Sequence, residues 1–133
     1  MIRKDYLMRL LKEFLDGLTE LLTHAKNENN EQILARTEGF YPTYLNQNRS
    51  FFIENSLSEI IPSIITENEE ESAIKCEMLA ELLFLDANHM QDKDKQEDTY
   101  KKILFFFDYA EQHSTTFSEN RMSKIATLKG ILD

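Results

Sequence analysis

The chain has little of the material that tight turns, disulfides and membrane spans require. Its 133 residues include three glycines, two prolines, one cysteine and no tryptophan. So few glycines and prolines leave too little turn material for a many-stranded β protein. The single cysteine, Cys76, excludes an internal disulfide and gives no evidence for an oxidising compartment. No stretch approaches the roughly 18 apolar residues that a membrane-spanning helix needs.

The balance of charge excludes further classes. Acidic residues number 24 against 15 basic ones, which gives a formal net charge of -9. Such a chain repels phosphate groups, so nucleic acid and anionic membranes are not expected as its main partners. Lys4, Asp5 and Arg9 interrupt any apolar stretch of a signal peptide. We therefore expect a cytoplasmic protein whose partner is another protein or a second copy of itself.

Apolar side chains at helical spacing are what the sequence does contain. The clearest case covers about residues 2–25, where Phe14 and seven leucines lie on one side and charged residues lie on the other. Further helices are expected over about 31–38, 57–65, 73–87 and 97–113, and from a capping signal at Thr116 and Glu119 to the end of the chain. We predict an all-α domain of five or six helices.

The segment over residues 40–52 is the least regular part of the chain. Pro42 disfavours helical angles at Tyr41, so we expect a turn or a short helix that aromatic side chains pin to the core. Ser56 and Glu59 form a capping box for the next helix, which Pro62 shortens or kinks. The following segment, 73–87, is apolar on most of its circumference, which predicts a helix packed between neighbours.

We expect residues 1–133 to form one domain in two parts. Residues 1–66 hold the first helices and the irregular aromatic segment, and residues 67–133 form a helical hairpin with a final helix that caps it. Leu79, Ala80 and Leu83, followed by Tyr100 and Ile103, are similar to the helical hairpins of tetratricopeptide repeats. That likeness implies a stacked antiparallel hairpin.

A second resemblance touches both ends of the chain. The residues that carry it are Asp5-Tyr-Leu-Met-Arg-Leu-Leu-Lys-Glu13, Ala80-Glu-Leu-Leu-Phe84, Tyr100, Phe117-Ser118, Arg121 and Lys124-Ile125. This pattern resembles a family of small, uncharacterised bacterial proteins that are all helical. The resemblance implies the same fold class and brings no known activity.

Residues that could carry chemistry are few. Cys76 has no neighbouring base or positive field and is interpreted as a core residue. Asp86 and His89, three residues apart and close to Asp92, suggest ligands of a metal ion. A small metal-dependent enzyme that uses these three residues is therefore the alternative function. No cofactor-binding motif is present in the sequence.

An aromatic cluster offers the strongest candidate for a binding surface. Phe105, Phe106 and Tyr109 lie off the main apolar face of the helix over 97–113, where a simple hairpin leaves them exposed. Either the chain around 40–52 folds back over them, or they contact a second copy or a foreign partner. We predict a non-enzymatic helical module for protein–protein interaction or scaffolding, with self-association as one form of that role.

Overall fold

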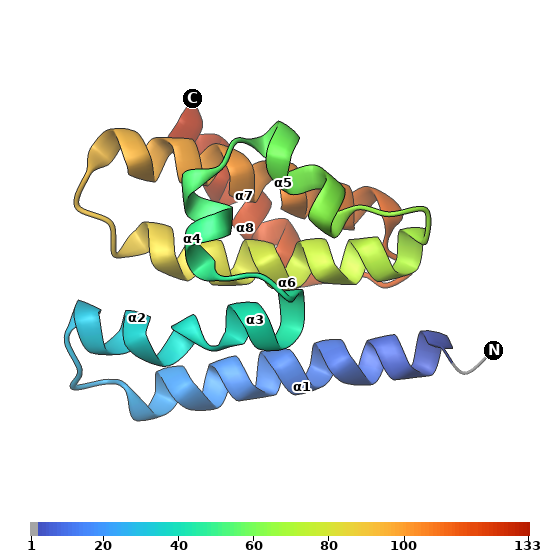
Figure 1. Cartoon of the computed structure of the whole chain (residues 1–133), viewed down its shortest axis with the longest axis horizontal. Coiled ribbons are helices and arrows are strands. Elements are labelled where there is room, and N and C mark those ends of the chain that lie inside the picture. The colour runs from blue at the N-terminus through green and yellow to red at the C-terminus, as the bar shows by residue number, and fades with distance from the viewer. Residues whose placement is uncertain (1–2) are drawn as a thin grey trace.

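The computed structural model describes residues 3–133, which form helices and no strand (Figure 1). The elements are α1 (Arg3–His24), α2 (Asn30–Glu38), α3 (Phe40–Leu45), α4 (Arg49–Glu54), α5 (Leu57–Ile64), α6 (Glu69–Asn88), α7 (Lys93–His113) and α8 (Glu119–Leu132). The all-helical class predicted from the sequence is confirmed. The predicted number of five or six helices is too low for this part of the chain.

The difference arises in the aromatic segment, where the chain forms the two short helices α3 and α4. Pro42 does not prevent α3, because it lies in the first turn, where a backbone N–H has no partner within the helix. Tyr41 is therefore helical, contrary to the expectation from Pro42. The expected anchoring is confirmed, since the side chains of Tyr41 and Phe52 are fully buried.

Helix α1 has nearly the predicted limits, and the predicted first residue, Ile2, lies outside the described residues. The buried part of its apolar side packs on the core of the same chain. Leu7 and Leu18 are buried, and the ring of Phe14 makes edge contacts with Phe40 and Tyr44 at centroid distances of 5.8 and 5.1 Å. These contacts join α1 to α3.

Polar side chains define where several helices begin. Capping boxes at Asn29 and Ser56 start α2 and α5, the second as predicted. Helix α6 begins at Glu69, earlier than predicted, because Asn68 caps it and glutamates in its first turn favour the positive end of the helix. Helix α8 is capped by Ser118, so the predicted capping role of Thr116 is wrong.

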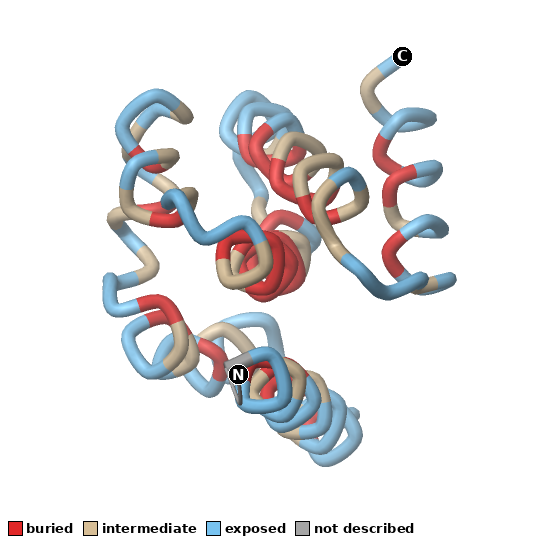
Figure 2. The backbone as a smooth tube through the Cα atoms, turned by 90° about the vertical axis from the view of Figure 1, so that its right-hand side faces the viewer, coloured by how far each residue is buried: buried red, intermediate tan, exposed pale blue. Residues whose placement is uncertain are grey.

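Helix α6 lies at the centre of the molecule (Figure 2). Helices α1 and α3 pack on one side of it, α7 packs along its other side, and α8 packs on α7 (Figure 1). Residues on every side of α6 are buried, as the apolar circumference of its sequence predicts. One hydrophobic cluster contains residues from Leu7 in α1 to Leu128 in α8, so both parts of the chain share it.

Helices α6 and α7 form an antiparallel pair joined by residues 89–92, and this hairpin is the most extensive helix contact among the described residues. None of the helices within residues 3–133 is long and apolar enough to cross a membrane.

Candidate functional site

The aromatic cluster predicted on α7 is not an exposed patch. Phe106 is 0% exposed, and Phe105 and Tyr109 are half-buried and pack against the core. Lys102, four residues before Phe106 and on the same side of α7, donates hydrogen bonds to carbonyl groups of α4. Helix α4 therefore covers this side of α7. This finding corrects the expectation that a simple hairpin leaves this side of α7 exposed.

The three residues of the predicted metal site are engaged in other contacts. Asp86 accepts a hydrogen bond from Tyr41, and Nδ1 of His89 donates to the carbonyl of Leu85 at 2.8 Å. Asp92 caps α7 by accepting from the backbone N–H of Lys95 at 3.1 Å and from that of the residue before it. Within residues 3–133, no three His, Cys, Asp or Glu side chains are grouped so that they could hold a metal ion.

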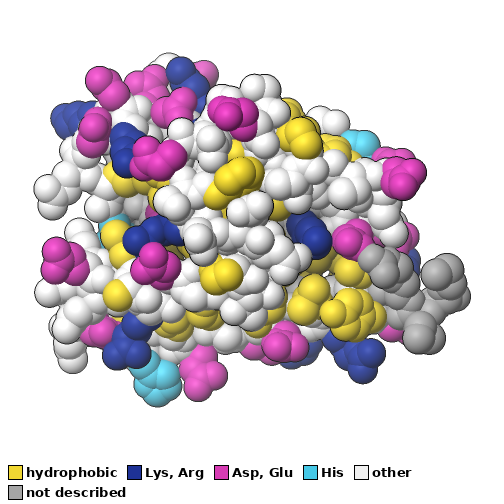
Figure 3. Space-filling model, in the orientation of Figure 1, with side chains coloured by type: hydrophobic (Ala, Val, Ile, Leu, Met, Phe, Trp, Pro, Cys, Tyr) yellow, Lys and Arg dark blue, Asp and Glu magenta, His cyan; other side chains and the backbone are white. Residues whose placement is uncertain are grey.

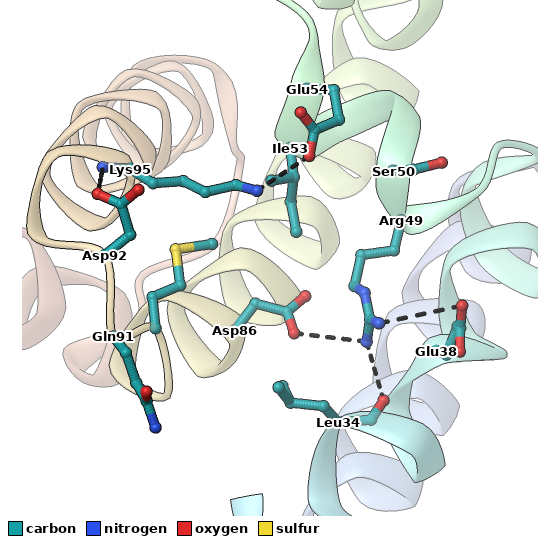
Figure 4. Close-up of a pocket in the computed structure, with 11 residues that line it drawn as sticks. Leu34, Glu38, Arg49, Ser50, Ile53, Glu54, Asp86, Gln91, Asp92 and Lys95 are labelled. Carbon is teal, nitrogen blue, oxygen red and sulfur yellow. Dashed lines mark hydrogen bonds and ion pairs between the residues drawn. The ribbon is translucent and has the colours of Figure 1, made fainter. Parts of the chain in front are cut away.

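Two of these residues, Asp86 and Asp92, line the same pocket, which has a volume of about 350 Å³ and which we call the Arg49 pocket. It lies between α2, α4 and the turn from α6 to α7 (Figure 4). Its lining residues are Leu34, Glu38, Arg49, Ser50, Ile53, Glu54, Asp86, Met90, Gln91, Asp92 and Lys95. This volume is near the lower end of the range for sites that bind small molecules.

A left-handed turn places the central arginine. Helix α3 ends at Leu45, and the capping residue Asn46 that follows has a φ of 61°, a left-handed conformation that Asn is one of the few residue types to tolerate. Helix α4 then crosses α6 with Arg49 as its first residue (Figure 1). The side chain of Arg49 thereby reaches both α2 and α6.

The guanidinium of Arg49 connects three helices. One of its terminal nitrogens donates to the carbonyl of Leu34 at 3.0 Å and lies 3.7 Å from a carboxylate oxygen of Asp86. The other terminal nitrogen lies 4.0 Å from the carboxylate of Glu38, beyond hydrogen-bond distance. Figure 4 shows this fork between α2 and α6, with Arg49 projecting from α4.

Asp86 forms the buried end of the pocket and is only 3% exposed. Burial raises the pKa of its carboxyl, and the hydrogen bond from Tyr41 and the charge of Arg49 oppose that rise. Burial also raises the pKa of Tyr41 well above its ordinary value, with the neighbouring Asp86 as the next cause. Tyr41 therefore stays neutral and keeps its proton for the carboxylate.

The opening of the pocket carries charges of both signs. Lys95 on α7 lies 3.0 Å from Glu54 at the end of α4. Glu38, at the end of α2, occupies the opposite side of the opening (Figure 4). On this face, in the left part of Figure 3, acidic and basic side chains surround hydrophobic ones. The arrangement can hold a ligand that has both an apolar and a charged part.

A second polar cluster is structural. Arg121 on α8 is 1% exposed and donates to Glu77 on α6 and Glu111 on α7, both at 2.7 Å. Lys124 pairs with Glu81 beside it. These groups satisfy one another and fasten α8 to the hairpin.

Cys76 is buried nearby in α6, where burial raises the pKa of its thiol, as expected of a core cysteine.

No protein-family model, curated protein or solved structure matches this chain. The resemblance to small bacterial helical proteins therefore stays a prediction.

Proposed function

We propose that this protein is a non-enzymatic helical module for protein–protein interaction or scaffolding and that it takes a side chain of its partner into the Arg49 pocket. The observation that carries the proposal is the fixed position of Arg49, which contacts α2 and α6 at the end of a pocket large enough for one side chain. A pocket held by buried polar contacts is preorganised, and preorganisation reduces the entropy cost of binding.

The side chains that line the pocket are of the types that suit binding of a partner's side chain. Leu34, Ile53 and Met90 provide half-buried apolar surface, and Met is a side chain that adapts to different partners. The charged groups of Glu38, Glu54 and Lys95 stand at the opening, as in interfaces whose apolar centre has a polar rim. In this proposal the tetratricopeptide-like hairpin of α6 and α7 is the support on which α2 and α4 build the pocket.

The binding surface proposed here replaces the one predicted from the sequence, because Phe106 is core. Self-association stays a prediction, and the partner is then either a second copy or another protein. The molar mass in solution, measured by light scattering, separates these two forms of the proposal.

A blocking variant tests the pocket. Ser50 is exposed at its edge, so Ser50→Trp fills the opening without replacing a core residue. Ser123→Trp, at an exposed position on α8, is the matched control. A phage library of random dodecapeptides is selected on the wild-type protein, and each enriched peptide is measured on both variants by fluorescence anisotropy. We expect enriched peptides that bind wild type and Ser123→Trp and lose binding to Ser50→Trp. The proposal fails if no enriched peptide distinguishes the two variants.

A further inference from the structure

We infer that the group bound in the Arg49 pocket is a lysine or arginine side chain from a basic segment of the partner protein. This inference rests on the function proposed above and adds the chemistry of the partner. It follows from the charge around the pocket, from the contacts that its two cations already make and from the apolar side chains that form its walls.

The lining has an excess of negative charge. Four carboxylates, those of Glu38, Glu54, Asp86 and Asp92, stand against the two cations Arg49 and Lys95, which gives a formal charge of -2. The whole chain has the same sign, with a net charge of -9. Both the local and the long-range field therefore attract a cationic group and repel an anionic one.

The two cations of the pocket already have partners. Arg49 donates to the carbonyl of Leu34 and lies beside Asp86, while Lys95 is paired with Glu54. An anionic ligand would have to displace these acceptors and would also approach the carboxylate of Glu38. The arrangement therefore disfavours a carboxylate or phosphate as the bound group.

The carboxylates at the opening remain accessible to a new donor. The side chains of Glu38 and Glu54 are 61% and 64% exposed. Glu38 lies 4.0 Å from Arg49, too far for a hydrogen bond, so its oxygens can accept from an incoming ammonium or guanidinium. The two glutamates flank the pocket from α2 and α4 (Figure 4).

The apolar walls fit the rest of a basic side chain. Lysine and arginine carry a long aliphatic stem that packs on apolar surface while the charged head stays near water. Leu34, Ile53 and Met90 supply that surface beneath the charged opening. A single side chain of this type uses both the apolar and the acidic parts of the pocket.

The test compares two double variants that change net charge equally. Glu38→Gln/Glu54→Gln removes the acidic opening, and Glu20→Gln/Glu97→Gln removes two exposed glutamates on α1 and α7 that do not line the pocket. The probes are the dodecapeptides that lose binding to Ser50→Trp, each also made with its lysines and arginines replaced by norleucine. Circular dichroism checks that every variant is folded.

We expect these peptides to be enriched in lysine or arginine. Binding should weaken about tenfold in the pocket double variant and in the norleucine peptides, and change little in the control double variant. Pocket-dependent peptides that lack basic residues would overturn this inference and leave the proposed function standing. Equal weakening in both double variants would also overturn it, because overall charge would then be the cause. The absence of any pocket-dependent peptide defeats the proposed function itself.

Discussion

At the scale of single residues, the carboxyl group of Asp86 links the pocket to the stability of the fold. Its pKa is raised by burial, so the folded chain holds this proton more tightly than the unfolded chain. The contribution of Asp86 to the free energy of unfolding therefore decreases as the pH rises from the ordinary pKa of 3.8 through the folded value. The hydrogen bond from Tyr41 limits this loss, because it stabilises the ionised form.

Tyr41→Phe removes that hydrogen bond and leaves the buried carboxylate short of a donor. We expect the free energy of unfolding near neutral pH to fall by about 1–3 kcal/mol. Without the hydrogen bond from Tyr41, which lowers the pKa of Asp86, that pKa rises further. We therefore expect the free energy of unfolding to go on decreasing to a higher pH than in the wild type. Urea unfolding followed by circular dichroism at a series of pH values measures both effects.

Tyr6→Phe is the control for this change, because it removes a hydroxyl group from a tyrosine that is 54% exposed. Its unfolding curves should match those of the wild type at every pH. A Tyr41→Phe protein with wild-type stability and pH dependence would contradict the role assigned to this hydrogen bond.

At the scale of helices, α4 depends on a lysine from α7. A helix of six residues is too short to be stable by itself, and α4 carries four residues of the pocket, which are Arg49, Ser50, Ile53 and Glu54. The ammonium group of Lys102, almost fully buried, donates to the carbonyls of Phe52 and Ile53 at 3.4 and 2.9 Å. It satisfies carbonyl groups near the end of α4 that lack helical partners.

Lys102→Met keeps most of the side-chain volume and removes the donor. We expect a loss of about 1–3 kcal/mol in the free energy of unfolding, since the two carbonyls stay buried without a partner. Lys101→Met, at the neighbouring exposed position, should change it by less than about 0.5 kcal/mol. The two variants are compared by urea unfolding, and equal losses would show that the carbonyl contacts of Lys102 contribute nothing specific.

The helices themselves follow from local patterns that the sequence displays. The spacing of leucines in α1, the capping box at Ser56 and the apolar circumference of α6 each act within a few residues, so sequence analysis finds them. Sequence analysis allows for one short helix in the aromatic segment but not for the pair α3 and α4, because a helix as short as α4 depends on tertiary contacts such as those of Lys102 rather than on an intrinsic preference.

The Arg49 pocket cannot be predicted from the sequence for a related reason. Tyr41 and Asp86 are 45 residues apart, and no spacing in the sequence indicates that they meet. Asp86 and Asp92 attract attention because they lie close to His89 in the sequence, yet their partners in the fold are a tyrosine and backbone N–H groups. The burial of Phe106 likewise depends on where α4 packs on α7, which periodicity on α7 does not specify.

At the scale of the whole molecule, a buried arginine joins α6, α7 and α8, the three helices within residues 67–133. Arg121 reaches from α8 to Glu77 on α6 and Glu111 on α7, and its guanidinium also donates to the carbonyl of Thr116 at 2.8 Å. Only Ile125 and Leu128 are buried apolar residues of α8. The attachment of α8 therefore relies on this charged group as well as on apolar packing.

Arg121→Met should lower the free energy of unfolding by about 3–5 kcal/mol, because it leaves the carboxylate of Glu77 buried without its cation. The double variant Arg121→Met/Glu77→Met removes that charge as well, and we expect it to regain a large part of the loss, since Glu111 is exposed enough to be solvated. Lys12→Met, at an exposed ion pair on α1, is the control and should change stability by less than about 1 kcal/mol. Urea unfolding of the wild type and the three variants measures these differences in the free energy of unfolding. If the double variant is no more stable than Arg121→Met, the packing of the arginine side chain, and not its charge, is what holds α8 in place.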